Sequence, residues 1–352
     1  MTAPTVGYVG LNHHHAEPYL QSLAELPVDV TCVCEPDETF DVTSVEAVAH
    51  VPSYDTVTQL LENERPDVLW VSLSNRDTPR VVETAVQHGV DVYTEKPVAR
   101  TTSELEPLIK TVDASESTVA VSYPWRSHPV SQELQKRNDD GFFGTLRSVD
   151  ARFVASSLQY RDVDHYLFDR HASGGGIVQW LGIHWIDLLP WLLDDPIVAV
   201  SAKTTTTHPE TEVEDGAIVQ FELASGALGT LQCGYYLRSD RYDTSIKIDG
   251  MDGTAAWDPI GDFFGFDDKT TLELESSKSS YRTAPRRFIT YDYNPIPGYG
   301  GGFGLEFMQQ FLTARTSRDV EVPASLQDAM VVLRVLDAVY ESAESGEWVT
   351  VR

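Results

Sequence analysis

Short apolar runs alternate with helical segments through about the first 120 residues, which excludes an all-helical or all-strand fold for this part of the chain. Thr78-Pro79 is a typical helix start, and Gly89 a typical helix end. Strands that alternate with helices predict a parallel, doubly wound α/β sheet, which binds its ligands beyond the carboxyl ends of its strands. The predicted strands are Thr5–Val9, Val28–Cys34, Asp67–Leu73 and Val90–Thr94; the predicted helices are Pro18–Leu26, Tyr54–Leu61, one from Thr78 to Gly89, and one with a capping box at Ser103 and Glu106.

After Val121 the pattern changes to successive strands with short links, which favours an antiparallel sheet. Two helices close the chain, and the glycine-rich segment Gly298 to Gly304 before them is predicted to be mobile, as a candidate lid. We therefore divide the chain into a first domain of residues 1–124 and a second of residues 125–352. The predicted strands are Leu146–Ala155, Val198–Thr206, Ala217–Leu223, Ala227–Tyr236, Thr244–Ile248 and Arg287–Tyr293, and the closing helices are Leu305–Leu312 and Leu326–Ser342.

The chain is strongly acidic. Its 352 residues include 54 Asp and Glu against 26 Lys and Arg, giving a net charge of −28. Such a charge repels phosphates, so we expect no nucleic-acid partner. The acids are spread along the whole chain and only seven basic residues are Lys, which indicates a halophilic protein that stays hydrated in high salt.

No apolar run approaches the roughly 18 residues of a spanning helix, and the first residues lack the pattern of a signal peptide. We therefore expect a soluble, cytoplasmic protein with no membrane partner. The three cysteines are too few for a disulfide framework and are interpreted as buried thiols.

The turn after the first predicted strand partly matches a dinucleotide-binding fingerprint. That fingerprint needs glycines at positions 10, 12 and 15, and only Gly10 is present; Asn12 tolerates the left-handed backbone, whereas His15 is a poor replacement. Glu35 ends the second strand, 25 residues after Gly10, where an acid would bind a ribose 2′-hydroxyl and repel a 2′-phosphate. The pattern favours NAD over NADP. The alternative is that Glu35 is an ordinary surface acid.

The run His13-His14-His15 is not predicted to hold a metal. Consecutive residues rarely point at one ion, and no pattern of Cys or carboxylate partners surrounds them. A polar loop near the cofactor phosphates is the better interpretation.

Glu95-Lys96-Pro97 follows the strand that ends at Thr94, at the ligand-binding edge of the predicted sheet. A partly desolvated Lys beside a nicotinamide could hydrogen-bond a substrate hydroxyl and help its proton to leave. The alternative is a surface Lys before a turn proline.

A triple glycine, Gly174 to Gly176, precedes an apolar segment that predicts a helix towards Leu193, bent near Pro190. Trp180, His184, Asp187 and Trp191 would share one stripe of that helix. His184 could be a satisfied core residue, or could face a gap between domains where its pKa suits proton transfer.

Together these motifs resemble the glucose-fructose oxidoreductase, inositol dehydrogenase and MocA (Gfo/Idh/MocA) family over nearly the whole chain. The resemblance implies an N-terminal Rossmann domain, a C-terminal domain built on a large, open, mostly antiparallel sheet, and hydride transfer between NAD(P) and a sugar, cyclitol or related polyol. It rests on Val6-Gly7-Tyr8-Val9-Gly10, Val33-Cys34-Glu35-Pro36, Glu95-Lys96-Pro97, the block from Gly174 to Asp187, Glu214-Asp215-Gly216-Ala217, and Gly346-Glu347-Trp348-Val349.

The resemblance also implies roles for single residues. Lys96 matches the family's catalytic Lys, His184 matches its acid/base His or Tyr, and Asn75 matches an Asn on the cofactor side. Two departures stand out: Trp180 takes the place of an Asp found in many members, and Thr78 that of a common His. The candidate cofactor-binding residues are Gly10, Asn12, Glu35, Asn75, Glu95 and Lys96. The candidate substrate residues are Arg126, His165, Tyr166 and Trp180, and Arg126 lies on a stretch that resembles the family's entry to the second domain.

The leading hypothesis is thus an NAD-dependent oxidoreductase acting on a sugar or sugar-derived alcohol. One alternative is a glycosidase or lyase that reduces and regenerates bound NAD; another is a non-catalytic sensor or assembly protein that binds the cofactor. An open sheet commonly leaves a face to bury, so a homodimer or homotetramer is expected.

Overall fold

The computed structural model describes residues 3–209, 211–238, 242–260, 269–292, 296–317 and 319–352. The chain divides into two units, each described here by itself. Unit 1 comprises Met1–Pro124 with Ile296–Val331, and unit 2 comprises Trp125–Pro295 with Val332–Arg352.

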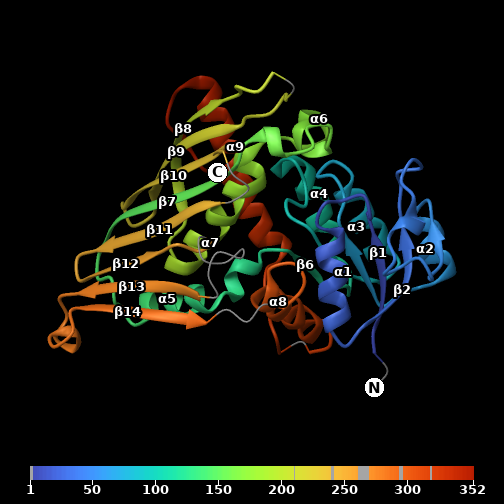
Figure 1. The fold of residues 1–352 in the computed structure, drawn as a ribbon, viewed down its shortest axis with the longest axis horizontal. Helices are drawn as coiled ribbons and strands as arrows, with labels where there is room; N and C mark the ends of the chain where they lie inside the picture. The colour runs from blue at the N-terminus through green and yellow to red at the C-terminus, as the bar shows by residue number, and fades with distance from the viewer. Residues whose placement is uncertain (1–2, 210, 239–241, 261–268, 293–295, 318) are drawn as a thin grey trace. The chain divides into compact units, whose positions relative to one another are not determined.

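Unit 1 contains a six-stranded parallel sheet in the order β3-β2-β1-β4-β5-β6, of which β1, β2 and β6 are labelled in Figure 1. β1 pairs in parallel with both β2 and β4, so the chain moves outward from β1 in both directions and leaves a switch point between β1 and β4. The sheet is the predicted doubly wound one. Its strands are β1 (Thr5–Val9), β2 (Asp29–Cys34), β3 (Ser53–Tyr54), β4 (Val68–Val71), β5 (Asp91–Thr94) and β6 (Val119–Val121).

The helices of the first 124 residues lie close to their predicted positions, with two corrections at their starts. Ser53 and Tyr54 pair with β2 as β3, so the second helix begins later, where the Thr56 side chain accepts a hydrogen bond from the Gln59 amide at 3.3 Å. The fourth helix has Thr101, not Ser103, before its first turn. The helices are α1 (Ala16–Glu25), α2 (Val57–Asn63), α3 (Thr78–Gln87) and α4 (Thr102–Asp113).

The glycine-rich segment from Gly298 to Gly304 begins as a turn and ends in a helix. Gly301–Gly304 form the first turn of α8 (Gly301–Ala314). A Cβ on Gly304 would lie 1.9 Å from the Tyr299 carbonyl oxygen, so the close approach of these two residues requires glycine. Phe311 of α8 packs against Trp70 and Tyr93 of the parallel sheet, with ring centroids 6.4 and 5.6 Å apart. This apolar packing groups Ile296–Val331 with unit 1, although the segment follows the second sheet in sequence.

Unit 2 contains a nine-stranded sheet in the order β14-β13-β12-β11-β7-β10-β9-β8-β15. Only the β10–β7 pair is parallel among these described strands; the rest are antiparallel, as predicted. The sequence analysis did not predict β12, β13 or β15. The strands are β7 (Leu146–Ser156), β8 (Ile197–Thr205), β9 (Gly216–Leu223), β10 (Leu228–Leu237), β11 (Asp243–Gly250), β12 (Gly253–Trp257), β13 (Lys269–Ser276), β14 (Arg286–Asp292) and β15 (Val349–Thr350).

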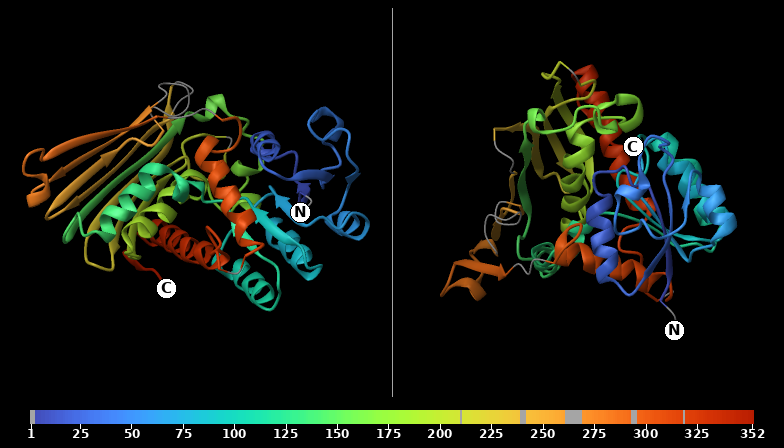
Figure 2. Two further views of the ribbon diagram at one scale, coloured as in Figure 1. Left: turned by 90° about the horizontal axis from the view of Figure 1, so that it is seen from below. Right: turned by 45° about the vertical axis from the view of Figure 1, so that its right-hand side comes forward.

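Helices α5 (Pro129–Asp139) and α7 (Ile183–Leu193), with the second part of α9 (Leu326–Ser345), lie along one face of this sheet (Figure 2). Trp185 of α7 donates from its indole nitrogen to the Arg152 carbonyl of β7 at 2.9 Å. Side chains along β9 alternate between buried and exposed, as in a sheet buried on one face. The exposed set includes Ile218, Leu228 and Phe288, each more than half exposed.

Candidate active site

The turn after β1 requires a glycine at its first position. Gly10 has a φ of +90°, and a Cβ there would lie 1.9 Å from the Ser72 carbonyl oxygen. Its amide donates to the Cys34 carbonyl at 3.0 Å, which ties the turn to the end of β2. The backbone therefore turns sharply between β1 and α1, as a dinucleotide-binding turn does.

Glu35 is buried at the carboxyl end of β2, where its carboxylate holds that turn. Oε2 accepts from the Asn12 amide and Oε1 from the Asp37 amide, both at 2.8 Å. Burial raises the pKa of Glu35, and these backbone hydrogen bonds oppose the rise. The structure thus brings together Gly10, Asn12 and Glu35, three of the residues predicted to bind the cofactor.

The side chains at the two lost glycine positions have other partners. The Asn12 amide group donates to Asp37 at 2.9 Å, whereas the His15 ring contacts Glu95. Asn75 is buried in the loop between β4 and α3. A tight turn before a ten-residue helix, with an acid at the end of β2, fits a dinucleotide whose phosphates lie at the start of α1.

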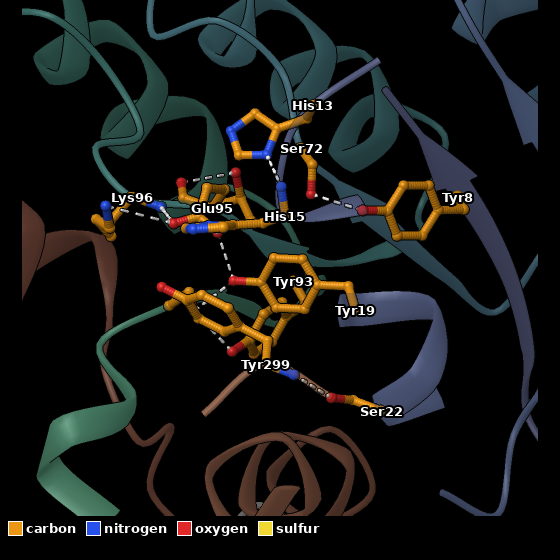
Figure 3. Close-up of polar contacts among 12 residues, drawn as sticks. Tyr8, His13, His15, Tyr19, Ser22, Ser72, Tyr93, Glu95, Lys96 and Tyr299 are labelled. Atoms are coloured by element: carbon orange, nitrogen blue, oxygen red, sulfur yellow. Dashed lines mark hydrogen bonds and ion pairs between the residues drawn. The ribbon is translucent and has the colours of Figure 1, made fainter. Parts of the chain in front are cut away.

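Glu95 is the centre of a buried polar network at the carboxyl end of β5 (Figure 3). Oε2 accepts from the Tyr19 hydroxyl at 2.5 Å and lies 3.2 Å from His15 Nδ1. Oε1 accepts from the Lys96 backbone amide at 3.1 Å. The Tyr19 oxygen also lies 2.8 Å from Ser122 Oγ, so the network joins α1, β5 and the end of β6.

Lys96 has a fully buried side chain, and its ammonium nitrogen lies 3.8 Å from Glu95 Oε1. Burial lowers the pKa of Lys96 to about 8, although the negative charge of Glu95 opposes this. Burial alone would raise the pKa of Glu95, but His15 and Lys96 outweigh it and hold that pKa well below its usual range. A carboxylate therefore stands beside an amine that can exchange its proton near neutral pH.

In unit 2, His184 lies in the first turn of α7, where its buried ring stacks on Phe153 of β7 at 6.0 Å. The predicted single stripe needs a continuous α-helix, but Val178–Gly182 form a π-helical turn. An extra residue in that turn changes the angular position of Trp180 relative to His184, so the stripe holds only within α7. Pro190 lies inside α7.

Arg126 and Asp187 form a buried ion pair within unit 2. Arg126 donates from Nη2 to Oδ1 at 2.5 Å and from Nε to Oδ2 at 3.1 Å. The guanidinium also lies 5.7 Å from the ring centroid of Trp191. Of the other candidate substrate residues, Trp180 is buried in the π-helical turn, and His165 and Tyr166 are half-buried with ring centroids 4.6 Å apart.

The triple glycine has a structural explanation that involves Glu214. This buried carboxylate accepts from the amides of Gly176 and Val178, at 2.8 and 3.1 Å, and from the Tyr340 hydroxyl at 3.0 Å. A Cβ on Gly175 would lie 1.9 Å from the Tyr340 oxygen, and one on Gly176 would lie 2.0 Å from the Glu214 carbonyl oxygen. Close backbone approach therefore requires these glycines.

Sequence reasoning missed three members of the Glu95 network. Tyr19 and Tyr299 were not singled out, and His15 was considered as a poor glycine replacement and as part of a polar loop near the cofactor phosphates, not as a partner of Glu95. The Tyr299 ring is tilted against both other rings, with centroids 4.4 Å from His15 and 4.6 Å from Tyr19, and its amide donates to the Pro18 carbonyl at 3.1 Å. The signal that the sequence offered was His15, a polar ring at the position of the third fingerprint glycine.

Two kinds of site are absent from the described part of the chain. No group of three or more His, Cys, Asp or Glu side chains there could hold a metal ion. No helix among those residues is long and apolar enough to cross a membrane.

A doubly wound sheet with this turn and a buried Glu-Lys pair is typical of dinucleotide-dependent oxidoreductases. The same chain also forms a nine-stranded sheet. Family comparison agrees: residues 5–123 match the oxidoreductase family with an NAD-binding Rossmann fold, and residues 131–256 match the GFO/IDH/MocA C-terminal domain. The chain belongs to the Gfo/Idh/MocA family of NAD(P)-dependent oxidoreductases.

Individual relatives are distant. D-xylose 1-dehydrogenase [NADP(+)] of Haloarcula marismortui is 24% identical over 305 residues, 85% of this chain and 79% of the relative. An oxidoreductase domain protein from Kribbella flavida has the same fold, with a TM-score of 0.85, 22% identity and full coverage of both chains. A levoglucosan dehydrogenase in complex with NADH and L-sorbose gives a TM-score of 0.84 at 20% identity, also with full coverage of both chains.

Proposed function

We propose that this protein is an NAD-dependent dehydrogenase that oxidises a CH–OH group of a sugar, cyclitol or sugar-derived alcohol. The observation that carries the proposal is the buried pair of Glu95 and Lys96 at the carboxyl end of β5. An amine with a pKa near 8 in the ligand-binding edge of a doubly wound sheet suits proton transfer at neutral pH.

The roles of the residues follow from their chemistry. Bound NAD would accept the hydride from the carbon that carries the hydroxyl. Lys96 would hydrogen-bond the hydroxyl and stabilise the oxygen as its proton leaves, and His184 would take that proton. Glu95 holds its carboxylate beside the Lys96 ammonium.

We propose NAD rather than NADP as the cofactor, held by Gly10, Asn12, Glu35, Asn75, Glu95 and Lys96. Glu35 and the neighbouring Asp37 place two carboxyl groups after β2, where a 2′-phosphate would lie. Their negative charge would repel that phosphate, while Glu35 could still accept from a ribose hydroxyl.

A sugar-like substrate is supported by the relatives, which are named for xylose and levoglucosan. We propose that Arg126, His165, Tyr166 and Trp180 contact it, with Trp180 stacking on the apolar face of a sugar ring. Because Arg126 already pairs with Asp187, a substrate oxygen would share its guanidinium with that carboxylate.

The test is NADH formation at about 340 nm with a panel of polyols and aldoses, comparing the parent with Lys96→Met. Turnover by the variant should fall at least ~10²-fold, the low end of a general acid-base contribution. Lys110→Met is the matched control, because Lys110 is exposed on α4 and pairs only with Glu106 among the ion pairs described. Equal rates for Lys96→Met and the parent would disprove the catalytic role.

Other outcomes of the same assay identify the alternative functions. Substrate conversion with no net NADH would indicate a glycosidase or lyase with a closed redox cycle. NAD binding without turnover on the whole panel would indicate a sensor or assembly protein.

We also propose that the chain works in the cytoplasm as a homodimer or homotetramer adapted to high salt. The exposed apolar side chains on the nine-stranded sheet support self-association, and the net charge of −28 supports the adaptation. Sedimentation at high ionic strength tests the oligomeric state.

A further inference from the structure

His15 and Lys96 contact opposite oxygens of one buried carboxylate. His15 Nδ1 lies 3.2 Å from Glu95 Oε2, and the Lys96 ammonium nitrogen lies 3.8 Å from Oε1. The two residues are far apart in the chain, yet both lie beside the Glu95 carboxylate. A change in hydrogen bonding at one oxygen therefore alters the charge available at the other.

We propose that His15 is a positioning residue that sets the proton affinity of Lys96 through Glu95. A neutral His15 that donates from Nδ1 shares the negative charge of Glu95, which weakens the hold of that carboxylate on the Lys96 proton. The effect on turnover rests on the proposed function, whereas the effect on the proton affinity of Lys96 does not.

Several features keep His15 in this arrangement. Its backbone amide donates to His13 Nδ1 at 3.0 Å, and its ring packs against the tilted ring of Tyr299, with centroids 4.4 Å apart. Burial lowers the pKa of His15, which favours the neutral donor form near pH 7. Its side chain is nevertheless 19% exposed, so protons can reach it from solvent.

The tyrosines around Glu95 stay protonated, whereas His15 can change its charge as the pH falls below neutral. Tyr19 from α1 donates to Oε2, and burial with the charge of Glu95 raises the pKa of Tyr19 well above its usual value, so it stays protonated. Burial likewise raises the pKa of Tyr93 on β5. His13 adds a weaker positive influence on Glu95, and the ring of Tyr299 packs against both His15 and Tyr19.

The direction of the effect follows from what remains after a substitution. In His15→Leu, Glu95 still accepts from Tyr19 and from the Lys96 amide, so the carboxylate keeps its place while its charge is less shared. The pKa of Lys96 should then rise. In Glu95→Gln the carboxylate charge is lost and the pKa of Lys96 should fall.

The experiment is a pH titration of the lysine ¹³Cε signals in the protein without cofactor. Seven lysines give seven signals, and Lys96→Met assigns the one of interest. The Lys96 midpoint should rise by about one pKa unit in His15→Leu and fall in Glu95→Gln. His15→Asn, whose Nδ2 can replace Nδ1 as donor, should restore the parent midpoint.

The matched control is His50→Leu, because His50 is an exposed histidine of the same unit. The Lys96 midpoint in His50→Leu should equal the Lys96 midpoint in the parent. An unchanged midpoint in His15→Leu, or equal shifts in His15→Leu and His15→Asn, would overturn the proposal.

A measurement on the parent alone covers the case in which His15→Leu does not fold. Protonation of His15 should shift the Lys96 ¹³Cε signal a second time, below the ordinary histidine pKa, because the two groups titrate as a coupled pair. A single inflection would contradict the coupling.

The pH profile of kcat/KM separates this inference from the proposed function. If both hold, the inflection of the profile moves with the Lys96 midpoint across the variants. A midpoint that moves in a protein without turnover supports the role of His15 and removes the proposed activity; turnover with an unmoved midpoint does the reverse.

Discussion

The Lys96 ammonium nitrogen lies 3.8 Å from Glu95 Oε1, and no part of the Lys96 side chain reaches solvent. Burial makes the Lys96 ammonium costly to charge, and the negative charge of Glu95 offsets part of that cost. This cost should affect both the free energy of unfolding of the protein and the proton exchange of Lys96.

Stability should depend on pH through Lys96. Its pKa is about 8 in the folded chain against an ordinary 10.5, so between these values the unfolded chain binds more protons. The free energy of unfolding of the parent, relative to Lys96→Met, should therefore rise from pH 8 to 10.5. The rise is about 3.5 kcal/mol at most, at about 1.4 kcal/mol for each of the roughly 2.5 pKa units. This gain in stability is fully present above pH 10.5 and is lost as the pH falls through 8. Urea titrations of both proteins over this pH range measure the gain. Parallel pH curves for the parent and Lys96→Met would refute the prediction.

Cofactor binding should depend on Glu35. In Glu35→Gln the new amide group faces the N–H of Asn12 or of Asp37, which loosens the turn after β1. We expect NAD to bind about tenfold more weakly, equal to about 1.4 kcal/mol, and the parent to prefer NAD over NADP. Calorimetric titration with both cofactors measures this. Glu38→Gln, a change at an exposed acid nearby, should bind NAD as the parent does.

Gly175→Ala should destabilise unit 2. The added methyl group would lie 1.9 Å from the Tyr340 oxygen, which must move and break its hydrogen bond to Glu214. We expect a loss of about 1–3 kcal/mol in the free energy of unfolding. Gly302→Ala in the first turn of α8 is the control, since the nearest atom to its new methyl group is 3.8 Å away. That variant should be neutral or up to about 1 kcal/mol more stable; equal losses in both variants would contradict the explanation.

Salt should stabilise the folded chain. With a net charge of −28, repulsion between acids opposes the compact state, and counter-ions screen it. The midpoint of thermal unfolding should rise by several degrees between about 0.2 M and about 3 M KCl. An uncharged osmolyte of matched osmolality should have a smaller effect. A flat response to KCl would exclude self-repulsion as the dominant cost.

Local patterns in the sequence predicted most of the fold. The strand Thr5–Val9 is correct to the residue, and the alternation that follows it fixed the doubly wound sheet. β12 was missed because its Gly and Ala residues have a low strand propensity, and β13 was missed although Leu272 and Leu274 alternate with glutamates. The π-helical turn at Val178–Gly182 was also missed, because the apolar run that contains it is compatible with an ordinary α-helix.

The sequence by itself determined the alternation of strands and helices in the first domain, the family and the position of Lys96 at the end of a strand, because each depends on residues close together in the chain. Only the tertiary structure decided that His15 and Glu95 meet, although 80 positions separate them. Parallel strands bring the turn after β1 and the end of β5 to the same edge of the sheet, and periodicity along the chain carries no record of which side chains meet there.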